Sequence, residues 1–233
     1  KFFTEFLYQH VFRNIKYQKS REDFIGRFYG EFMSYSGGDG QTLGIVLTPK
    51  HICDLMCDLA DVRPDDVVLD PTCGTAGYLI SAMHRMLSLA DNDQQRKEIK
   101  KRQLHGIEVR NDLFAVACTN MILRRDGNSN LLCCDFLKQN PAQLQMKGAT
   151  VGLMNPPYSQ GTKDDPDQYE ISFVEHLLDS LTIGGCAAVI VPQSTMTGKS
   201  KAEQKFKESI LKHHTLDGGF TCNTNPFYGV GTK

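Results

Sequence analysis

The chain has 233 residues, a formal net charge of −1, 40% hydrophobic residues and 23% charged residues. This length suits one sizeable domain with room for a short extra segment, and the composition is ordinary for a globular protein. No apolar run approaches the ~18 residues of a membrane span, and the balanced charge differs from the basic excess of a chain that grips nucleic acid alone. We therefore expect a cytoplasmic protein with no membrane association.

The eight cysteines form no CxxC pair and no Cys–His cluster with zinc spacing. Most lie in apolar runs such as 131–134 and 185–189, which is typical of buried thiols in a reducing compartment. We therefore expect no metal site, and we interpret Cys73 as a packing residue rather than a nucleophile.

The first 40 residues differ from the rest of the chain. Apolar residues recur at helical spacing from Phe2 to Val11 and from Phe24 to Phe32, which predicts one or two helices. The Gly- and Ser-rich segment 34–41 predicts a flexible connection. We expect residues 1–40 to be the tail of an N-terminal helical domain, and residues 41–233 to form a second domain.

The basic, aromatic-containing stretch 13–21 could contact phosphates, although a solvated helix surface is the more common meaning of such a pattern. Because the chain begins without Met and ends at Lys233 in a strand-like approach, we expect a fragment of a longer protein, in which the C-terminal part of the sheet can be incomplete.

Beyond residue 42, helix and strand patterns alternate along the chain. The predicted strands cover 67–70, 104–108, 130–134, 150–154 and 186–191. The predicted helices cover 49–60, 76–90, 111–125, 169–182 and 200–212, and the charged run 91–102 predicts an exposed helix extension or a loop. Near-continuous apolar strands between helices indicate an α/β fold with a doubly wound, mostly parallel sheet that is covered on both faces.

A small-residue turn, Pro71-Thr72-Cys73-Gly74-Thr75-Ala76-Gly77, follows the first predicted strand and its terminal Asp70. Gly74 and Gly77 permit a sharp turn and close approach of a ligand to the backbone. The helix that starts after the turn favours carboxylate or phosphate groups at its N-terminus. The turn lacks both the GxGxxG dinucleotide fingerprint and the Gly-Lys-Ser/Thr ending of a phosphate loop.

The tetrad Asn155-Pro156-Pro157-Tyr158 follows the apolar run 151–154. Neither proline can continue a strand ladder, because neither has an N–H to donate. The Asn carboxamide oxygen and a rigid backbone carbonyl offer two fixed acceptors, which suit an exocyclic amino group, and the Tyr ring can stack on a flat base or amide. On these four residues alone, a simple proline turn that closes a strand is an equally good interpretation.

Four polar residues, Asp70, Glu108, Asp135 and Asn155, fall at the predicted carboxyl ends of strands. In sheets of this kind, ligands bind beyond those ends, near the point where the strand order reverses. The positions therefore predict one shared site. Helix or turn capping by Asp70 and Asp135 stays an alternative.

In their order along the chain, these motifs resemble the amino-group DNA methyltransferases that use S-adenosylmethionine. The resemblance is closest to the modification subunit of type I restriction–modification systems. It also includes Thr48-Pro49 before a helix, the strand 104–108 with Glu108, and the strand 131–134 followed by Asp135 and Phe136. It covers about residues 40–230.

The resemblance implies a role for each site residue. Asn155 and the Pro156 carbonyl would accept hydrogen bonds from adenine N6, Pro157 would stiffen the tetrad, and Tyr158 would stack on the base. The cofactor would be held by Thr48, Pro49, Asp70, Thr72, Cys73, Gly74, Thr75, Gly77, Glu108, Asp135 and Phe136. Aromatic residues that follow strands are often simply core, so Phe136 has that alternative as well.

The resemblance also implies partners: double-stranded DNA with the target base flipped out, a specificity subunit and a restriction subunit. Methylation of a glutamine side chain or an RNA amine is an alternative, because the tetrad serves planar amides and amines in general. A non-catalytic cofactor-binding assembly subunit is a second alternative. A cytosine-N4 acceptor is disfavoured, since that group often carries Ser where this chain has Asn155.

Overall fold

The computed structural model describes Glu5, Gln9 and residues 47–124, 130–145, 147–158, 169–198 and 200–222. The expected helical segment 1–40 and its connection at 34–41 lie outside these residues, apart from Glu5 and Gln9. No helix in the described part of the chain combines the length and apolar character needed to cross a bilayer.

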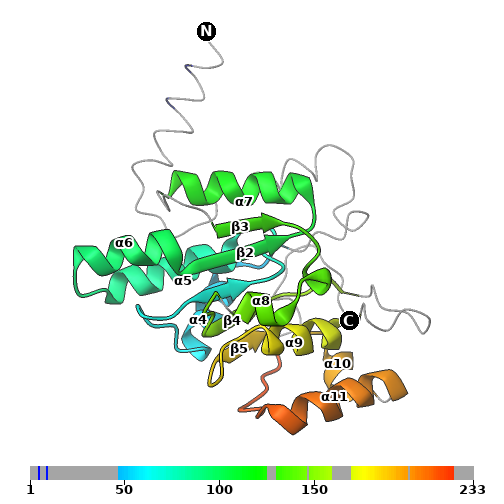
Figure 1. Cartoon of the computed structure of the whole chain (residues 1–233). Coiled ribbons are helices and arrows are strands. Elements are labelled where there is room, and N and C mark those ends of the chain that lie inside the picture. Colours follow the sequence, from blue (N-terminus) through cyan, green and yellow to red (C-terminus); the bar gives the residue numbers. More distant parts are fainter. Residues whose placement is uncertain are drawn as a thin grey trace.

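A five-stranded parallel sheet with the order β3-β2-β1-β4-β5 forms the centre of the fold (Figure 1). Its strands are β1 (Val68–Asp70), β2 (Leu104–Glu108), β3 (Asn130–Cys133), β4 (Val151–Met154) and β5 (Cys186–Val189). The α/β, doubly wound prediction is therefore confirmed. The observed strands are at most two residues shorter than predicted, because pairing stops where the chain turns away from its neighbour.

The helices are α4 (Lys50–Leu59), α5 (Gly77–Leu89), α6 (Asp93–Arg102), α7 (Asn111–Leu123), α8 (Pro141–Gln145), α9 (Glu170–Asp179), α10 (Gln193–Thr197) and α11 (Lys201–His213), with a 3₁₀ turn η2 (Phe136–Lys138). The charged run 91–102 forms a separate exposed helix, α6, whose Asn92 cap accepts a hydrogen bond from the Gln95 N–H. The short elements α8, α10 and η2 were not predicted, because one or two turns carry too few residues to show a period.

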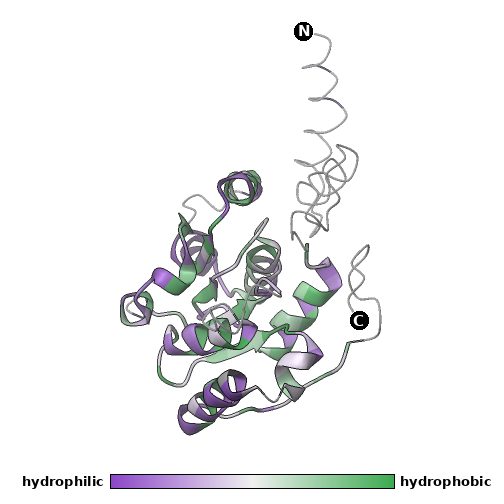
Figure 2. Ribbon diagram, turned by 90° about the vertical axis from the view of Figure 1, so that its right-hand side faces the viewer, coloured by the Kyte–Doolittle hydropathy of each residue, from purple (hydrophilic) through white to green (hydrophobic). Residues whose placement is uncertain are grey.

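Two hydrophobic clusters cover the two faces of the sheet. The first joins β-strand residues such as Val68 to α4, α5, α6 and α7. The second joins residues such as Leu69 to η2, α8 and α9. Neighbouring residues of one strand thus enter opposite clusters, which explains why the strands are apolar without alternation. Figure 2 shows the resulting arrangement, with the strands between helical layers.

Candidate functional site

The candidate site lies where the sheet reverses its strand order, between β1 and β4. Asp70 ends β1, Glu108 ends β2, and Asn155 follows β4 directly. A pocket opens at this edge, and its walls come from the segment before α4, the turn after β1 and the residue after β4. The residues that line it are Leu47, Thr48, Thr72, Cys73, Gly74, Thr75, Gly77, Tyr78 and Asn155.

The turn between β1 and α5 adopts a backbone that few residues favour. Gly74 has φ +53° and Ala76 has φ +71°, so two residues of this short turn occupy the left-handed region. Gly77 then begins α5, and a Cβ at this position would lie 3.4 Å from the Cys53 Sγ. Helix α5 has no side-chain cap at its N-terminus. Its first backbone N–H groups are therefore available to an anionic ligand group.

Hydrogen bonds from neighbouring elements hold this turn in place. The Gly74 N–H donates to the Glu108 carboxylate at 2.9 Å, and the Cys73 N–H donates to the Ile107 carbonyl at 2.9 Å, both in β2. From the other side, the Thr72 hydroxyl donates to the Asn155 carbonyl at 3.1 Å. The turn thus has a defined shape before any ligand binds, which lowers the entropic cost of binding.

Asp70 is the acid at the end of β1 and is not among the residues that line the pocket. Its side chain is fully buried. One carboxylate oxygen, Oδ1, accepts from the Thr72 N–H at 3.3 Å, and the other, Oδ2, is buried without a hydrogen-bond partner in the structure. Burial raises the pKa of Asp70 well above its usual range; the Thr72 N–H opposes this rise, and the Glu108 carboxylate adds to it. A buried acceptor with no partner is costly in free energy, and a cationic ligand group would relieve that cost.

Asn155 is held at its carboxamide by two side chains. Its Nδ2 donates to the Thr48 hydroxyl at 3.0 Å, and its Oδ1 accepts from the Tyr158 hydroxyl at 2.7 Å. Thr48 comes from the segment before α4, where Pro49 precedes the first helical residue. Burial raises the pKa of Tyr158, and the Glu170 carboxylate adds to the rise, so the phenol stays protonated and can donate. The arrangement fixes the Asn155 Oδ1 in place. Its present donor, the Tyr158 hydroxyl, could be replaced by a donor on a ligand.

The sequence matches that of a known family. The sequence profile of the family described as "N-6 DNA Methylase" matches residues 20–233. The chain belongs to the N-6 DNA methylase family. The cofactor of this family is S-adenosylmethionine, and the comparison supports a DNA methylase over the glutamine-methylating, RNA-methylating and non-catalytic alternatives.

Relatives of this methylase domain are proteins of restriction–modification systems. The chain is 47% identical over 235 residues to the type II restriction enzyme and methyltransferase RM.BcgI of Heyndrickxia coagulans, covering 100% of this chain and 37% of that protein. It is 25% identical over 233 residues to the type I restriction enzyme EcoKI methylase subunit of Escherichia coli (strain K12), covering 92% of this chain and 44% of that subunit. The chain thus spans less than half the length of these relatives.

The fold also matches solved structures of this class. A modification subunit of a putative type I restriction enzyme from Vibrio vulnificus YJ016 superimposes with a TM-score of 0.66 at 21% identity. The match covers 80% of this chain and 42% of that subunit. At this identity the match supports the shared fold, a methyltransferase-type α/β sheet.

The pocket of the methylase domain fits its cofactor. S-adenosylmethionine carries an ammonium, a carboxylate and a sulfonium. The unpartnered Asp70 Oδ2 suits the ammonium, and the uncapped N-terminus of α5 suits the carboxylate. Gly77 leaves the backbone bare at the pocket wall. Burial raises the pKa of the Cys73 thiol well above its usual range, which keeps it protonated and favours the packing role.

Two predicted cofactor residues lie in a different environment. Asp135 Oδ1 accepts from the Leu137 N–H at 3.1 Å and caps η2, while its Oδ2 lies 3.1 Å from the Lys138 Nζ. Phe136 is 3% exposed in the second hydrophobic cluster. Its ring centroid lies 4.6 Å from that of His176, in an edge-to-face contact. The capping and core alternatives thus describe the geometry of both residues, and their cofactor contacts stay predictions.

The structure adds residues that the sequence did not point to. Leu47 and Tyr78 line the pocket. Asn120 is fully buried in α7, and its Nδ2 donates to the Thr75 carbonyl at 2.9 Å. A signal existed for Asn120, which is a polar residue on the inward side of an apolar helix pattern.

Proposed function

We propose that this chain is the methyl-transferring part of a site-specific DNA adenine-N6 methyltransferase in a restriction–modification system. Residues 41–233 would form the methyltransferase domain, and residues 1–40 would form the helical tail before it. The observation that carries the proposal is the position of Asn155, whose carboxamide lines the same pocket as the turn after β1. An acceptor for a target amine and a cofactor cradle thus lie in one pocket.

The tetrad supplies the positioning for the transfer. Bound S-adenosylmethionine supplies an activated methyl group on a sulfonium. The Asn155 Oδ1 and the Pro156 carbonyl accept hydrogen bonds from adenine N6 and stabilise positive charge as it develops on that nitrogen. Tyr158 stacks on the flipped base. Its hydroxyl donates to the Asn155 Oδ1 at 2.7 Å in this structure, so the entering amino group takes the place of this donor.

The turn and its neighbours would hold the cofactor. Asp70 would accept from its ammonium, the N-terminus of α5 would hold its carboxylate, and Thr48 would hold its methionine end. Glu108 would accept from the ribose hydroxyls, although its two carboxylate oxygens also accept from the Gly74 and Arg110 N–H groups at 2.9 and 2.8 Å. We assign Asp135 and Phe136 the smaller share of the binding free energy, because Asp135 caps its own turn and Phe136 packs in the hydrophobic core.

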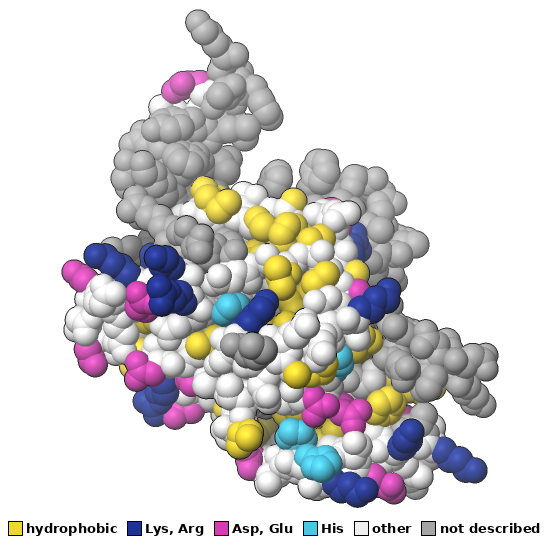
Figure 3. All heavy atoms as spheres, viewed as in Figure 1, with side chains coloured by type: hydrophobic (Ala, Val, Ile, Leu, Met, Phe, Trp, Pro, Cys, Tyr) yellow, Lys and Arg dark blue, Asp and Glu magenta, His cyan; other side chains and the backbone are white. Residues whose placement is uncertain are grey.

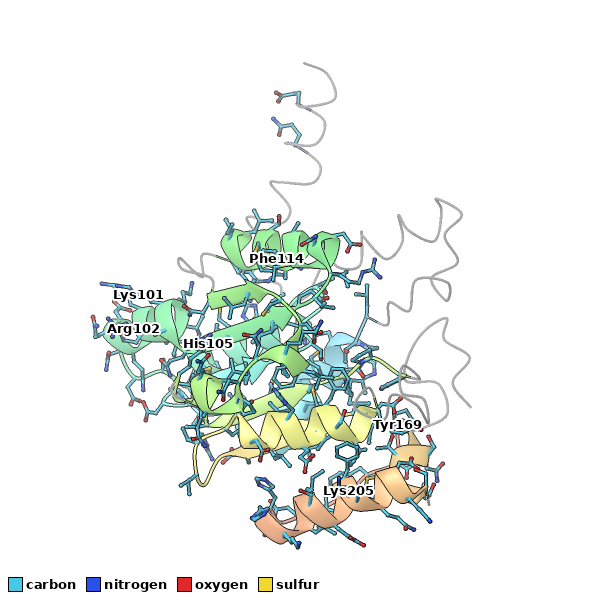
Figure 4. All side chains as sticks on the ribbon, turned by 45° about the vertical axis from the view of Figure 1, so that its right-hand side comes forward. Lys101, Arg102, His105, Phe114, Tyr169 and Lys205 are labelled. Atoms are coloured by element: carbon cyan, nitrogen blue, oxygen red, sulfur yellow. The ribbon has the colours of Figure 1, made fainter. Side chains whose placement is uncertain are left out.

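The charge on the described surface bears on how DNA is held. Lys100, Lys101 and Arg102 end α6, before the start of β2, and therefore lie at the amino ends of the strands. Figure 3 shows Lys and Arg side chains gathered over α6, and Figure 4 places Lys101, Arg102 and His105 at the end of the molecule opposite to Tyr169. Because the pocket lies at the carboxyl ends, this basic group points away from the target base.

We therefore propose that sequence recognition and much of the phosphate contact belong to other parts of the system. A specificity subunit would supply them, and a restriction subunit would complete the complex. The relative named as both restriction enzyme and methyltransferase offers another arrangement, in which the cleaving part belongs to the same polypeptide. Both arrangements place double-stranded DNA at the carboxyl edge of the sheet, and both are cytoplasmic.

Transfer of a labelled methyl group to unmethylated genomic DNA tests the proposal, with RNA and a glutamine-containing peptide as competing acceptors. Asn155→Ala should lower transfer to DNA by about 10²- to 10³-fold, the cost of losing one donor or acceptor aimed at the transition state. It should change S-adenosylmethionine affinity by less than about threefold, since the cofactor groups bind elsewhere.

The matched control is Asn140→Ala. The Asn140 Oδ1 accepts from the Ala142 N–H at 3.0 Å on an exposed surface, far along the chain from the tetrad. This variant should keep full transfer activity. Transfer to RNA or peptide in preference to DNA, or unchanged transfer by Asn155→Ala, would overturn the proposal.

A further inference from the structure

Asn120 is a buried polar residue in a helix that is otherwise apolar on its inward side. Its side chain is fully buried, as are those of Ala117 and Met121 beside it on α7. A carboxamide in such a place destabilises the fold unless its hydrogen bonds are made, and Asn also has a weak helix propensity. A Leu would serve packing at lower cost in free energy, so packing alone does not explain this residue.

The chemistry of its partners fixes the orientation of the Asn120 carboxamide. The Arg124 Nη1 donates to the Asn120 Oδ1 at 3.1 Å and to the Asn120 carbonyl at 3.0 Å. The Asn120 Nδ2 donates to the Thr75 carbonyl at 2.9 Å. A guanidinium can only donate and a carbonyl can only accept, so the reverse orientation would lose both side-chain contacts. Arg124 thereby directs the amide N–H at the turn.

The contacted carbonyl belongs to a constrained peptide of the cofactor turn. Thr75 lines the pocket, and the following Ala76 has φ +71°. The N–H of the same peptide unit donates from Ala76 to the Cys73 carbonyl. The Thr75–Ala76 peptide is therefore held at both of its polar ends. A left-handed non-glycine residue is unfavourable by roughly 1–2 kcal/mol on its own, so surrounding contacts must keep it there.

We propose that Asn120 is a positioning residue for the cofactor turn, which turns the Thr75 carbonyl toward α7 and away from the pocket. The inference rests on the proposed function, because it takes S-adenosylmethionine as the ligand of this pocket. With the carbonyl oxygen directed away, the pocket presents the N–H end of α5 to the ligand carboxylate. Loss of the bond removes a donor from a buried carbonyl and lets the turn sample shapes that bind poorly.

Asn120 lies outside the group of residues that line the pocket, so its effect on the ligand passes through the turn. This separates it from Asn155, which lines the pocket and offers its own atoms to a ligand. It also gives the inference a specific signature. Affinity for the cofactor should fall more than stability alone explains, and the backbone of the turn should become more open.

The experiment compares Asn120→Leu with Met121→Ala in the intact protein. Leu keeps the branched shape of Asn with a somewhat larger volume, and it removes the amide. Met121 is its fully buried neighbour on α7, and its truncation costs stability while the hydrogen bond from the Asn120 Nδ2 to the Thr75 carbonyl stays in place. Calorimetric titration with S-adenosylhomocysteine, the unreactive product, measures affinity. Amide hydrogen exchange at Ala76 measures opening of the turn, and urea unfolding measures stability.

We expect Asn120→Leu to weaken product binding by about tenfold or more and to speed exchange at Ala76, because a buried carbonyl loses its donor. Met121→Ala should leave both unchanged at a comparable or larger loss of stability. Arg124→Met, which removes the group that orients the amide, should weaken binding by a few-fold and serves also if Asn120→Leu does not fold.

If Asn120→Leu and Arg124→Met bind the product as tightly as the wild type does, the inference is overturned and the proposed function stays intact. Equal weakening by Met121→Ala would overturn it as well, since the effect would then follow from stability alone. No product binding by folded wild type would overturn both the inference and the assignment of the cofactor site.

Discussion

The turn after β1 and the turn after β3 follow neighbouring parts of one parallel sheet and carry similar sequence signals, an acid and then a short turn. Their contacts differ. The turn after β1 is held by other elements, through Glu108 of β2, Asn120 of α7 and the carbonyl of Asn155. In the turn after β3, the Asp135 carboxylate accepts from the nearby Leu137 N–H and pairs with the Lys138 Nζ.

This difference separates a binding surface from a structural turn. A carboxylate whose bonds are local, as in Asp135, stabilises its own turn and needs no ligand. Asp70 instead keeps the Oδ2 atom buried and unpartnered, at a free-energy cost that the fold alone does not offset. The buried polar group without a partner is therefore the better marker of the site than the acid at a strand end. Four substitutions or conditions test this comparison.

The largest effect should come from removing the charge of Asp70. Asp70→Asn keeps the shape of the side chain and the acceptor for the Thr72 N–H, but it loses the partner of the ligand ammonium. Such a loss in a buried site costs 2–5 kcal/mol, or about 30-fold or more in S-adenosylmethionine affinity by calorimetry. Asp135→Asn is the matched control and should weaken binding less than about threefold. Equal losses at both positions would erase the distinction between the two turns.

The second-largest effect should come from a change of pH, which should alter cofactor affinity through Asp70 and not through Asp135. The raised pKa of Asp70 keeps it protonated in the folded, free protein to a higher pH than in the unfolded chain. Its contribution to stability is thus complete below the ordinary Asp pKa of about 3.9 and is lost as pH rises through the folded pKa. An ammonium beside it favours the carboxylate, so binding releases a proton.

Affinity should therefore rise with pH, by at most about tenfold per unit, until the folded pKa of Asp70 is passed. Calorimetry from about pH 5 to 8, in buffers of different ionisation enthalpy, measures both the affinity and the released proton. Asp70→Asn should remove this part of the pH dependence, whereas Asp135→Asn should keep it. A wild-type affinity independent of pH, with no proton released, would contradict the assignment of Asp70.

The alternation of strands and helices was predictable from the sequence, because its hydrophobic patterns repeat along the chain. Each strand is an apolar run between helical patterns, and β1 to β4 each carry an Asp, Glu or Asn at or within two residues of the carboxyl end. That pattern led to the parallel sheet and to the neighbourhood of Asp70, Glu108 and Asn155. The tetrad and the glycine turn then pointed to the family, which the sequence profile confirms.

The parts that escaped prediction depend on contacts between distant residues. The sequence around Phe136 does not tell whether its ring contacts a ligand or packs in the core. The structure decides between the two, because Phe173 and His176 of α9 contact the ring. Asn120 stands 45 residues from its partner Thr75, so no local pattern connects them. Gly106 also looks unremarkable, yet a Cβ there would lie 2.6 Å from Leu131 Cδ2 and 2.9 Å from Leu79 Cδ1.

Phe136→Leu should distinguish core from cofactor contact in the turn after β3. Loss of ring volume and of the edge contact with His176 should lower the free energy of unfolding by about 1 kcal/mol in urea titrations. Affinity for S-adenosylmethionine should stay within about twofold. Phe173→Leu, in the same cluster, is the matched control and should behave alike. A Phe136-specific loss of affinity without a loss of stability would show that its ring meets the adenine.

The smallest effect concerns the cap of η2. Asp135→Ala removes the acceptor of the Leu137 N–H, and caps of this kind contribute roughly 0.5–1 kcal/mol to the free energy of unfolding. The ion pair with Lys138 adds little, because the Lys138 side chain is 81% exposed and water screens the pair. Asp135→Asn should therefore retain most of the stability, since the carboxamide oxygen can still cap. A loss of cofactor affinity in Asp135→Ala with unchanged unfolding would instead give this acid a binding role, and the two turns would then form two halves of one cradle.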